Sequence, residues 1–190
     1  MKRDVKNSGI IHINLLRIIS LTVLLALVMP VMINAQAVKA NFVGTWALNT
    51  SKSDMGQPPA QGQGQGQGQR MRGGMGTNFV ARQEANLLTI ESTRTNQNGE
   101  TSTVTSKYTL DGKESINTTP RGESKSTANW SADGKTLTIV TKRTFDMNGE
   151  SRTITSTQVM VLSADNTLTI TATTTTPDGD RTSKMVYDKK

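Results

Sequence analysis

Residues 136–162 read TLTIVTKRTFDMNGESRTITSTQVMVL, and this stretch decides the fold class. Its first part alternates apolar and polar residues, with Leu137 and Ile139 on one face and threonines on the other. Such alternation is the two-residue period of a strand that buries one face. Asn148-Gly149 then supplies a dipeptide that favours the backbone of a tight hairpin turn. The stretch therefore predicts two antiparallel strands, 136–145 and 151–162, joined by a short turn.

The same pattern continues along the chain in both directions. The sequence L-x-I-x-[ST]-x-R occurs at 88–94 and again at 137–143, which suggests a duplicated hairpin unit. Turn dipeptides of the Asn-Gly or Asp-Gly kind separate most runs. The predicted strands are 42–48, 78–83, 87–95, 101–110, 113–118, 124–131, 136–145, 151–162, 167–175 and 181–188. Short connections make sequence neighbours pair in space, so we expect an all-β, single antiparallel meander of about ten strands. Closing on itself as a barrel would remove its open edges.

The N-terminus differs sharply from the rest of the chain. Basic residues precede an apolar run at 18–33, and Ala35-Gln36-Ala37 follows. This order of basic region, apolar region and A-x-A site is typical of a secretory signal peptide. The apolar run is shorter than the roughly 20 residues of a membrane-spanning helix. We predict a signal peptide, 1–37, cleaved after Ala37 and followed by a domain, 38–190, exported to the periplasm or outside the cell. An uncleaved N-terminal anchor is the alternative.

The composition of residues 38–190 narrows the function classes. The chain has no Cys, and its one His, His12, lies in the predicted signal peptide. Zinc sites and His-based nucleophilic catalysis therefore lose their usual groups, and we predict no metal, no cofactor and no enzymatic activity. Residues 38–190 hold 18 Lys and Arg against 14 Asp and Glu, a net charge of +4 with both signs interspersed. No basic stripe with interleaved aromatics indicates nucleic-acid binding.

Residues 55–76 interrupt the pattern of strands. Their middle part alternates Gln and Gly and ends in Arg70 and Arg72. Such a composition buries little apolar surface, so we predict a disordered loop between the first two strands. The predicted domain has no further apolar run that would form a transmembrane segment.

Several short motifs resemble the calycins, the group that contains lipocalins and fatty-acid-binding proteins. The sequence FVGTW at 42–46 resembles their G-x-W first strand, and KMVYDKK at 184–190 resembles the last strand of the fatty-acid-binding group. The segments 44–54 and 108–113 are similar to those of small exported lipocalin-like proteins of bacteria. The resemblance implies a closed barrel that holds a ligand inside. Fatty-acid-binding proteins hold a carboxylate with an R-x-Y pair in the last strand; here Tyr187 is present, but Met185 occupies the Arg position.

Six residues are candidates for roles in the domain. Arg94 and Arg143 end the two copies of the repeat, and facing inward they would bind a carboxylate or phosphate. The alternative places both at the rim, in solvent or paired with Glu91, Glu100 or Glu150. Candidates for pocket-lining or core-filling residues are Tyr108 and Trp130. Structural candidates are Trp46, as a plug at the closed end, and Gly44, as a bend or a point of close backbone approach in the first strand.

These observations lead to one main functional hypothesis and two rivals. The main one is a monomeric, non-catalytic binding protein that holds a small hydrophobic or amphipathic molecule inside its barrel. The first rival is a structural or interaction protein of the cell envelope, with a filled barrel and the Gln/Gly loop as its contact. The second is an enzyme that uses carboxylates or Tyr.

Overall fold

The structure is a computed structural model that describes residues 37–56, 75–95, 99–119, 122–147, 149–176 and 179–190. The chain divides into two units, Met1–Gln36 and Ala37–Lys190, and the description below concerns the second. The predicted signal peptide, apart from Ala37, and most of the predicted Gln/Gly loop lie outside the described residues.

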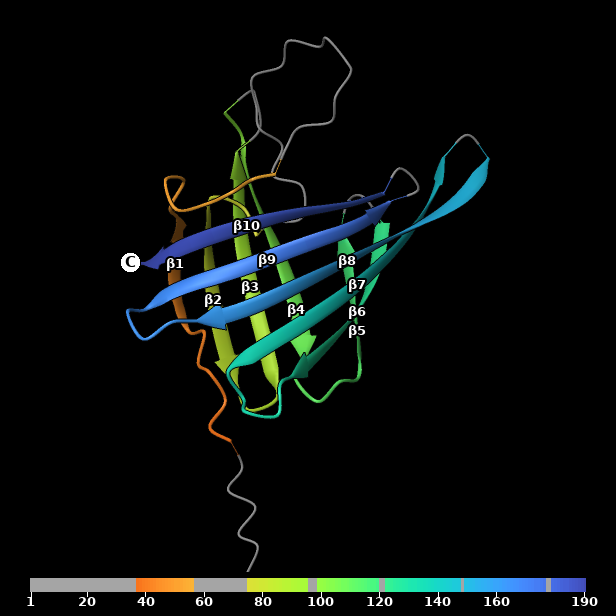
Figure 1. The fold of residues 1–190 in the computed structure, drawn as a ribbon. Coiled ribbons are helices and arrows are strands. Elements are labelled where there is room, and N and C mark those ends of the chain that lie inside the picture. The colour runs from red at the N-terminus through yellow and green to blue at the C-terminus, as the bar shows by residue number, and fades with distance from the viewer. Residues whose placement is uncertain (1–36, 57–74, 96–98, 120–121, 148, 177–178) are drawn as a thin grey trace, which may run out of the picture. The chain divides into compact units, whose positions relative to one another are not determined.

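One antiparallel sheet contains all the strands of this unit, which confirms the predicted all-β meander. The strands are β1 (Gly44–Leu48), β2 (Asn78–Glu84), β3 (Leu87–Thr95), β4 (Thr101–Thr109), β5 (Glu114–Thr119), β6 (Gly122–Trp130), β7 (Thr136–Met147), β8 (Glu150–Leu162), β9 (Thr167–Thr176) and β10 (Gly179–Lys189). Their order in the sheet is β4-β3-β2-β1-β10-β9-β8-β7-β6-β5. The first and last strands pair, so the meander curls round on itself. In Figure 1, β8, β9 and β10 cross in front of β1–β4 at a steep angle.

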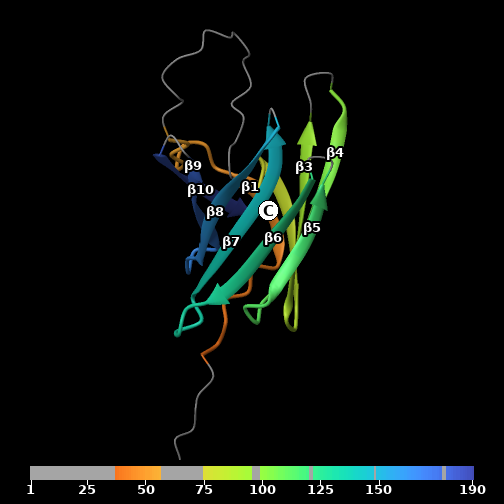
Figure 2. The ribbon, with the colours of Figure 1, turned by 90° about the vertical axis from the view of Figure 1, so that its right-hand side faces the viewer.

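The barrel is nearly closed, and side chains complete it between its two edge strands. Figure 2 shows β4 and β5 side by side, but no backbone ladder joins them in the described part of the chain. Lys107 N donates to Asn117 Oδ1 at 2.7 Å, and Asn117 Nδ2 donates to Lys107 O at 3.0 Å. Thr109 N donates to Ser115 Oγ at 2.8 Å. These bonds satisfy backbone groups that an open edge would leave unpaired.

The core follows from the alternation seen in the sequence. Leu88, Ile90, Leu137 and Ile139 are buried on the inner wall, as their alternation predicts. The strand register then joins apolar side chains into rows across the wall. One such row runs Met185, Ile170, Met160, Leu137, Trp130. Its members pack together because inward residues on neighbouring strands lie directly opposite one another.

The segment before β1 plugs one end of the barrel. Ala40 N donates to Gly134 O, in the β6–β7 turn, at 2.9 Å. The Gln83 side chain, near the β2–β3 turn, donates to Ala40 O and accepts from Phe42 N, both at 3.1 Å. Phe42 is fully buried, and its carbonyl accepts a 2.9 Å bond from Trp46 Nε1. Because these turns lie at one end of the sheet, residues 37–42 cover that end.

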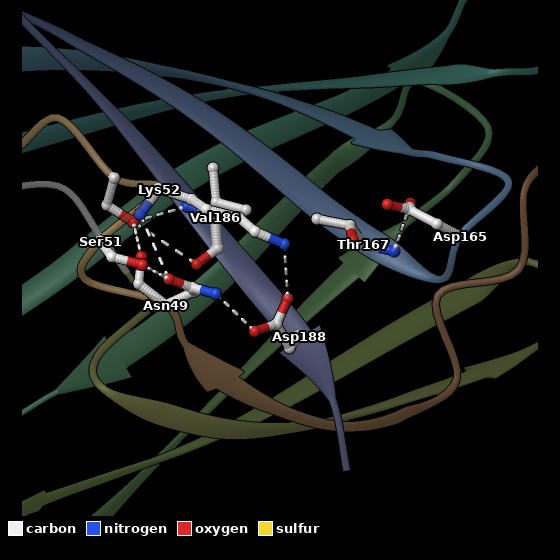
Figure 3. Close-up of polar contacts among 8 residues, drawn as sticks. Asn49, Ser51, Lys52, Asp165, Thr167, Val186 and Asp188 are labelled. Carbon is white, nitrogen blue, oxygen red and sulfur yellow. Dashed lines mark hydrogen bonds and ion pairs between the residues drawn. The ribbon is translucent and has the colours of Figure 1, made fainter.

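The segment after β1, residues 49–54, is hydrogen-bonded to β10 (Figure 3). Asn49 N donates to Val186 O at 2.8 Å, and Asn49 Nδ2 donates to Asp188 Oδ2 at 2.7 Å. Lys52 Nζ lies 3.7 Å from Asp188 Oδ1. The polar side chains of residues 49–54 therefore contact β10. Their role is structural, because they hold this segment against the barrel.

Candidate functional site

The first half of β8 is accessible on both of its faces. From Ile154 to Val159, inward and outward residues alike are half-buried, and only at Met160 does an inward side chain become fully buried. A strand over a filled interior would bury alternate residues. The inner face of β8 around Ser156 is therefore partly exposed to solvent, whereas the inner face at Met160 is fully buried.

Polar side chains line this part of the wall. The register aligns one inward residue from each strand, β10 back to β5, into a row. The row runs Arg181, Thr174, Ser156, Thr141, Ser126, Ser115. Ser126 and Thr141 share a 2.9 Å hydrogen bond. Every member of the row carries a hydrogen-bonding group, whereas the row through Met185 and Met160 is almost wholly apolar.

Arg143 lies beside this row. It pairs with Ile154 in the β7–β8 ladder and follows Thr141 by two residues, so both share the inner face of β7. Its Cζ lies 5.6 Å from the centroid of the Phe145 ring, within the range of a cation–π contact. Two of the carboxylates predicted as alternative partners of Arg143 at the rim pair with other arginines. Glu91 binds Arg82, and Glu150 binds Arg152.

Arg94, the other predicted clasp residue, lies on β3 opposite Ser102. Its side chain lies outside what the structure describes. The two arginines belong to β3 and β7, which are not neighbours in the sheet. Their joint role stays a prediction.

The two aromatic candidates pack with the core. Tyr108 lies opposite Leu88, and its burial raises the pKa of its hydroxyl, against a smaller lowering from the Ser106 side chain. Trp130 stacks on Phe42 with ring centroids 5.7 Å apart and planes 2° apart, at the plugged end. The Trp130 Nε1 atom is buried without a hydrogen-bond partner among the described residues.

The two structural candidates both lie in β1. Trp46 is fully buried and bonded to the plugging segment. Gly44 has a φ of 153°, a conformation that L side chains rarely adopt. A Cβ atom there would also lie 2.6 Å from Cε of the flexible Lys189 side chain.

Sequence reasoning missed Arg181, Ser156 and Thr174. Arg181 shares its face with Met185 and Tyr187, so the alternation of the last strand could have found it. Thr174 stands in the run 173–176, where every residue is Thr and alternation says nothing about direction. In the described ranges, no three His, Cys, Asp or Glu side chains gather as a possible metal site. The described part of the chain contains no helix that is long and apolar enough to cross a membrane.

The comparisons with known proteins find similarity among solved structures. No protein-family model matches the sequence, and the comparison with curated proteins finds no match. A solved structure of the zebrafish ileal bile acid-binding protein, complexed with cholic acid, is similar at a TM-score of 0.41 and 23% sequence identity. That similarity covers 60% of this chain and 72% of the zebrafish chain.

Proposed function

We propose that this protein is a non-catalytic binding module that holds a small amphipathic molecule inside its barrel. The partial exposure of β8 on both faces from Ile154 to Val159 carries the proposal, because partly exposed side chains on an inner wall can contact a bound molecule. Ligand sites in barrels combine apolar surface with a few polar groups that fix orientation. The row through Met160 supplies apolar surface here, and the row through Ser156 supplies hydroxyls.

The titratable groups of the barrel support a binding role over a catalytic one. Residues 38–190 contain no imidazole or thiol. Burial raises the pKa of both Tyr108 and Tyr187, so both phenols stay protonated at neutral pH. A protonated phenol is a poor general base.

Mass spectrometry of the gently isolated protein tests the proposal. We expect a non-covalent complex whose added mass belongs to one small molecule. Ser156→Tyr places a bulky ring on the inner face of β8, so the added mass should disappear. Thr157→Tyr places the same ring on the outer face of that strand, so the added mass should remain. Circular dichroism melting would establish that both variants fold.

One observation favours the rival, a filled envelope protein without a ligand. Large side chains, among them Trp46, Phe79 and Tyr187, are fully buried and fill much of the interior. That rival predicts that the isolated protein has the mass of the polypeptide alone and binds no amphipathic probe. These two results together would overturn our proposal in favour of the rival.

We further propose that the domain is exported and that its signal peptide is cleaved after Ala37. Val38 is 92% exposed at the start of the plugging segment, so cleavage there would leave the plug intact. Expression of the full-length gene with its own N-terminus in an exporting bacterial host should yield a protein that begins at Val38 by intact mass. A mass that retains residues 1–37 would favour the uncleaved anchor.

A further inference from the structure

Resting on the proposed function, we infer that the bound molecule carries an anionic group, a carboxylate or a phosphate, held by Arg143 and Arg181. These residues flank Ser156 and Thr174 on the inner wall of β7–β10. The site differs from the predicted pairing of Arg143 with Arg94.

The strand register brings the two arginines to one patch of wall. Arg181 lies opposite Thr174, Thr174 opposite Ser156, and Ser156 opposite Thr141. Arg143 follows Thr141 by two residues on the same face. From β7 to β10 the backbone spacing is about 14 Å, since adjacent strands lie about 4.8 Å apart. Two long arginine side chains can therefore reach one group bound between them.

The charges on this patch are unbalanced. Among the described residues, neither Arg143 nor Arg181 has a carboxylate partner, whereas Arg82 and Arg152 each have one. Both unpaired residues are half-buried, so water solvates their guanidinium groups less fully than it does on the open surface. Because a guanidinium offers a planar fork of donors, a carboxylate or phosphate is the group that matches it.

The neighbouring side chains indicate the rest of the ligand. The hydroxyls of Ser156 and Thr174 can bond polar atoms beside the anion, and Phe145 and Ile154 offer apolar contact next to Arg143. Arg181 lies four residues before Met185, which occupies the Arg position of the fatty-acid-binding pattern. The anionic group is therefore expected nearer the β9–β10 turn than that pattern would place it.

Calorimetric titration of the isolated protein with three probes tests the inference. The probes are dodecyl phosphate, 1-dodecanol and inorganic phosphate, with both dodecyl probes below their aggregation limits. A charge-assisted hydrogen bond contributes enough that dodecyl phosphate should bind at least about tenfold more tightly than dodecanol. Arg143→Gln and Arg181→Gln should each weaken dodecyl phosphate about tenfold and leave dodecanol unchanged. Arg82→Gln, which removes an outward-facing arginine, is the matched control and should leave all affinities unchanged.

The three probes separate failure of this inference from failure of the proposed function. Equal affinities for dodecyl phosphate and dodecanol, unaffected by either arginine variant, would overturn the anion site and keep the barrel as an amphiphile carrier. If neither dodecyl probe binds, the proposed function and the inference both fail. Inorganic phosphate that binds as tightly as dodecyl phosphate, with the same dependence on the arginines, would support the anion site and overturn an amphipathic ligand.

Discussion

At the residue scale, two tryptophans of the same barrel have unequal surroundings. Trp46 Nε1 donates to Phe42 O, whereas Trp130 Nε1 is buried without a partner among the described residues. Trp46→Phe should therefore lower the free energy of unfolding by about 2–3 kcal/mol, from the lost bond, the unpaired carbonyl and a small cavity. Trp130→Phe removes an unpaired donor and keeps a stacking ring, so its cost should stay below about 1 kcal/mol.

Urea unfolding followed by circular dichroism would measure both variants at one pH. Equal losses would contradict the assigned roles, because they would mean that ring volume alone decides stability at the plugged end.

At the element scale, the seam between β4 and β5 rests on side chains in place of a ladder. Asn117→Ala leaves the Lys107 amide and carbonyl without their bonds, at a cost of about 1–3 kcal/mol. Hydrogen exchange at the Lys107 amide should accelerate more than at amides of the β7–β8 ladder. Thr118→Ala, an exposed neighbour on β5, is the control and should change neither quantity.

The segment that pins β10 gives a second prediction at this scale. Asn49 makes part-buried bonds to β10, while Lys52 contributes an exposed ion pair to Asp188. Asn49→Ala should lower the urea midpoint by an amount worth about 1–2 kcal/mol. Lys52→Ala should cost less than about 0.5 kcal/mol, because water and salt screen exposed ion pairs. If Lys52→Ala lost more stability than Asn49→Ala, the ion pair to Asp188, and not the Asn49 side-chain amide, would hold the segment on β10.

At the scale of the whole molecule, stability should depend on pH in the alkaline range. Burial raises the pKa of Tyr187 from its ordinary 10.0 to about 12. The unfolded chain loses this proton first, so the contribution is complete below pH 10 and is lost as pH rises toward 12. The loss amounts to roughly 2–3 kcal/mol.

Urea unfolding between pH 8 and pH 12 would follow this loss. The free energy of unfolding of the Tyr187→Phe variant should fall less steeply with pH than that of the unaltered protein. Some decline remains in the variant, because burial also raises the pKa of Tyr108. Identical slopes for the two proteins would show that Tyr187 does not titrate across this range.

Much of the architecture was predictable because its signals are local. The predicted strands match the observed ones to within a few residues at their ends, including both copies of the L-x-I-x-[ST]-x-R repeat. The site was less predictable. Arg143 could be named as a candidate because it ends a clear alternation, whereas Thr174 stands in a run of threonines that gives no direction.

The sequence by itself determined where strands and turns lie and which apolar residues face inward, since alternation and turn dipeptides act over a few residues. Only the tertiary structure decided which residues meet across the barrel. The β1–β10 pairing closes the meander, Ser115 and Asn117 complete its seam, and the register sets Arg181 and Arg143 on one wall. Each of these depends on pairing between distant segments, where a shift of one residue would turn every side chain to the other face.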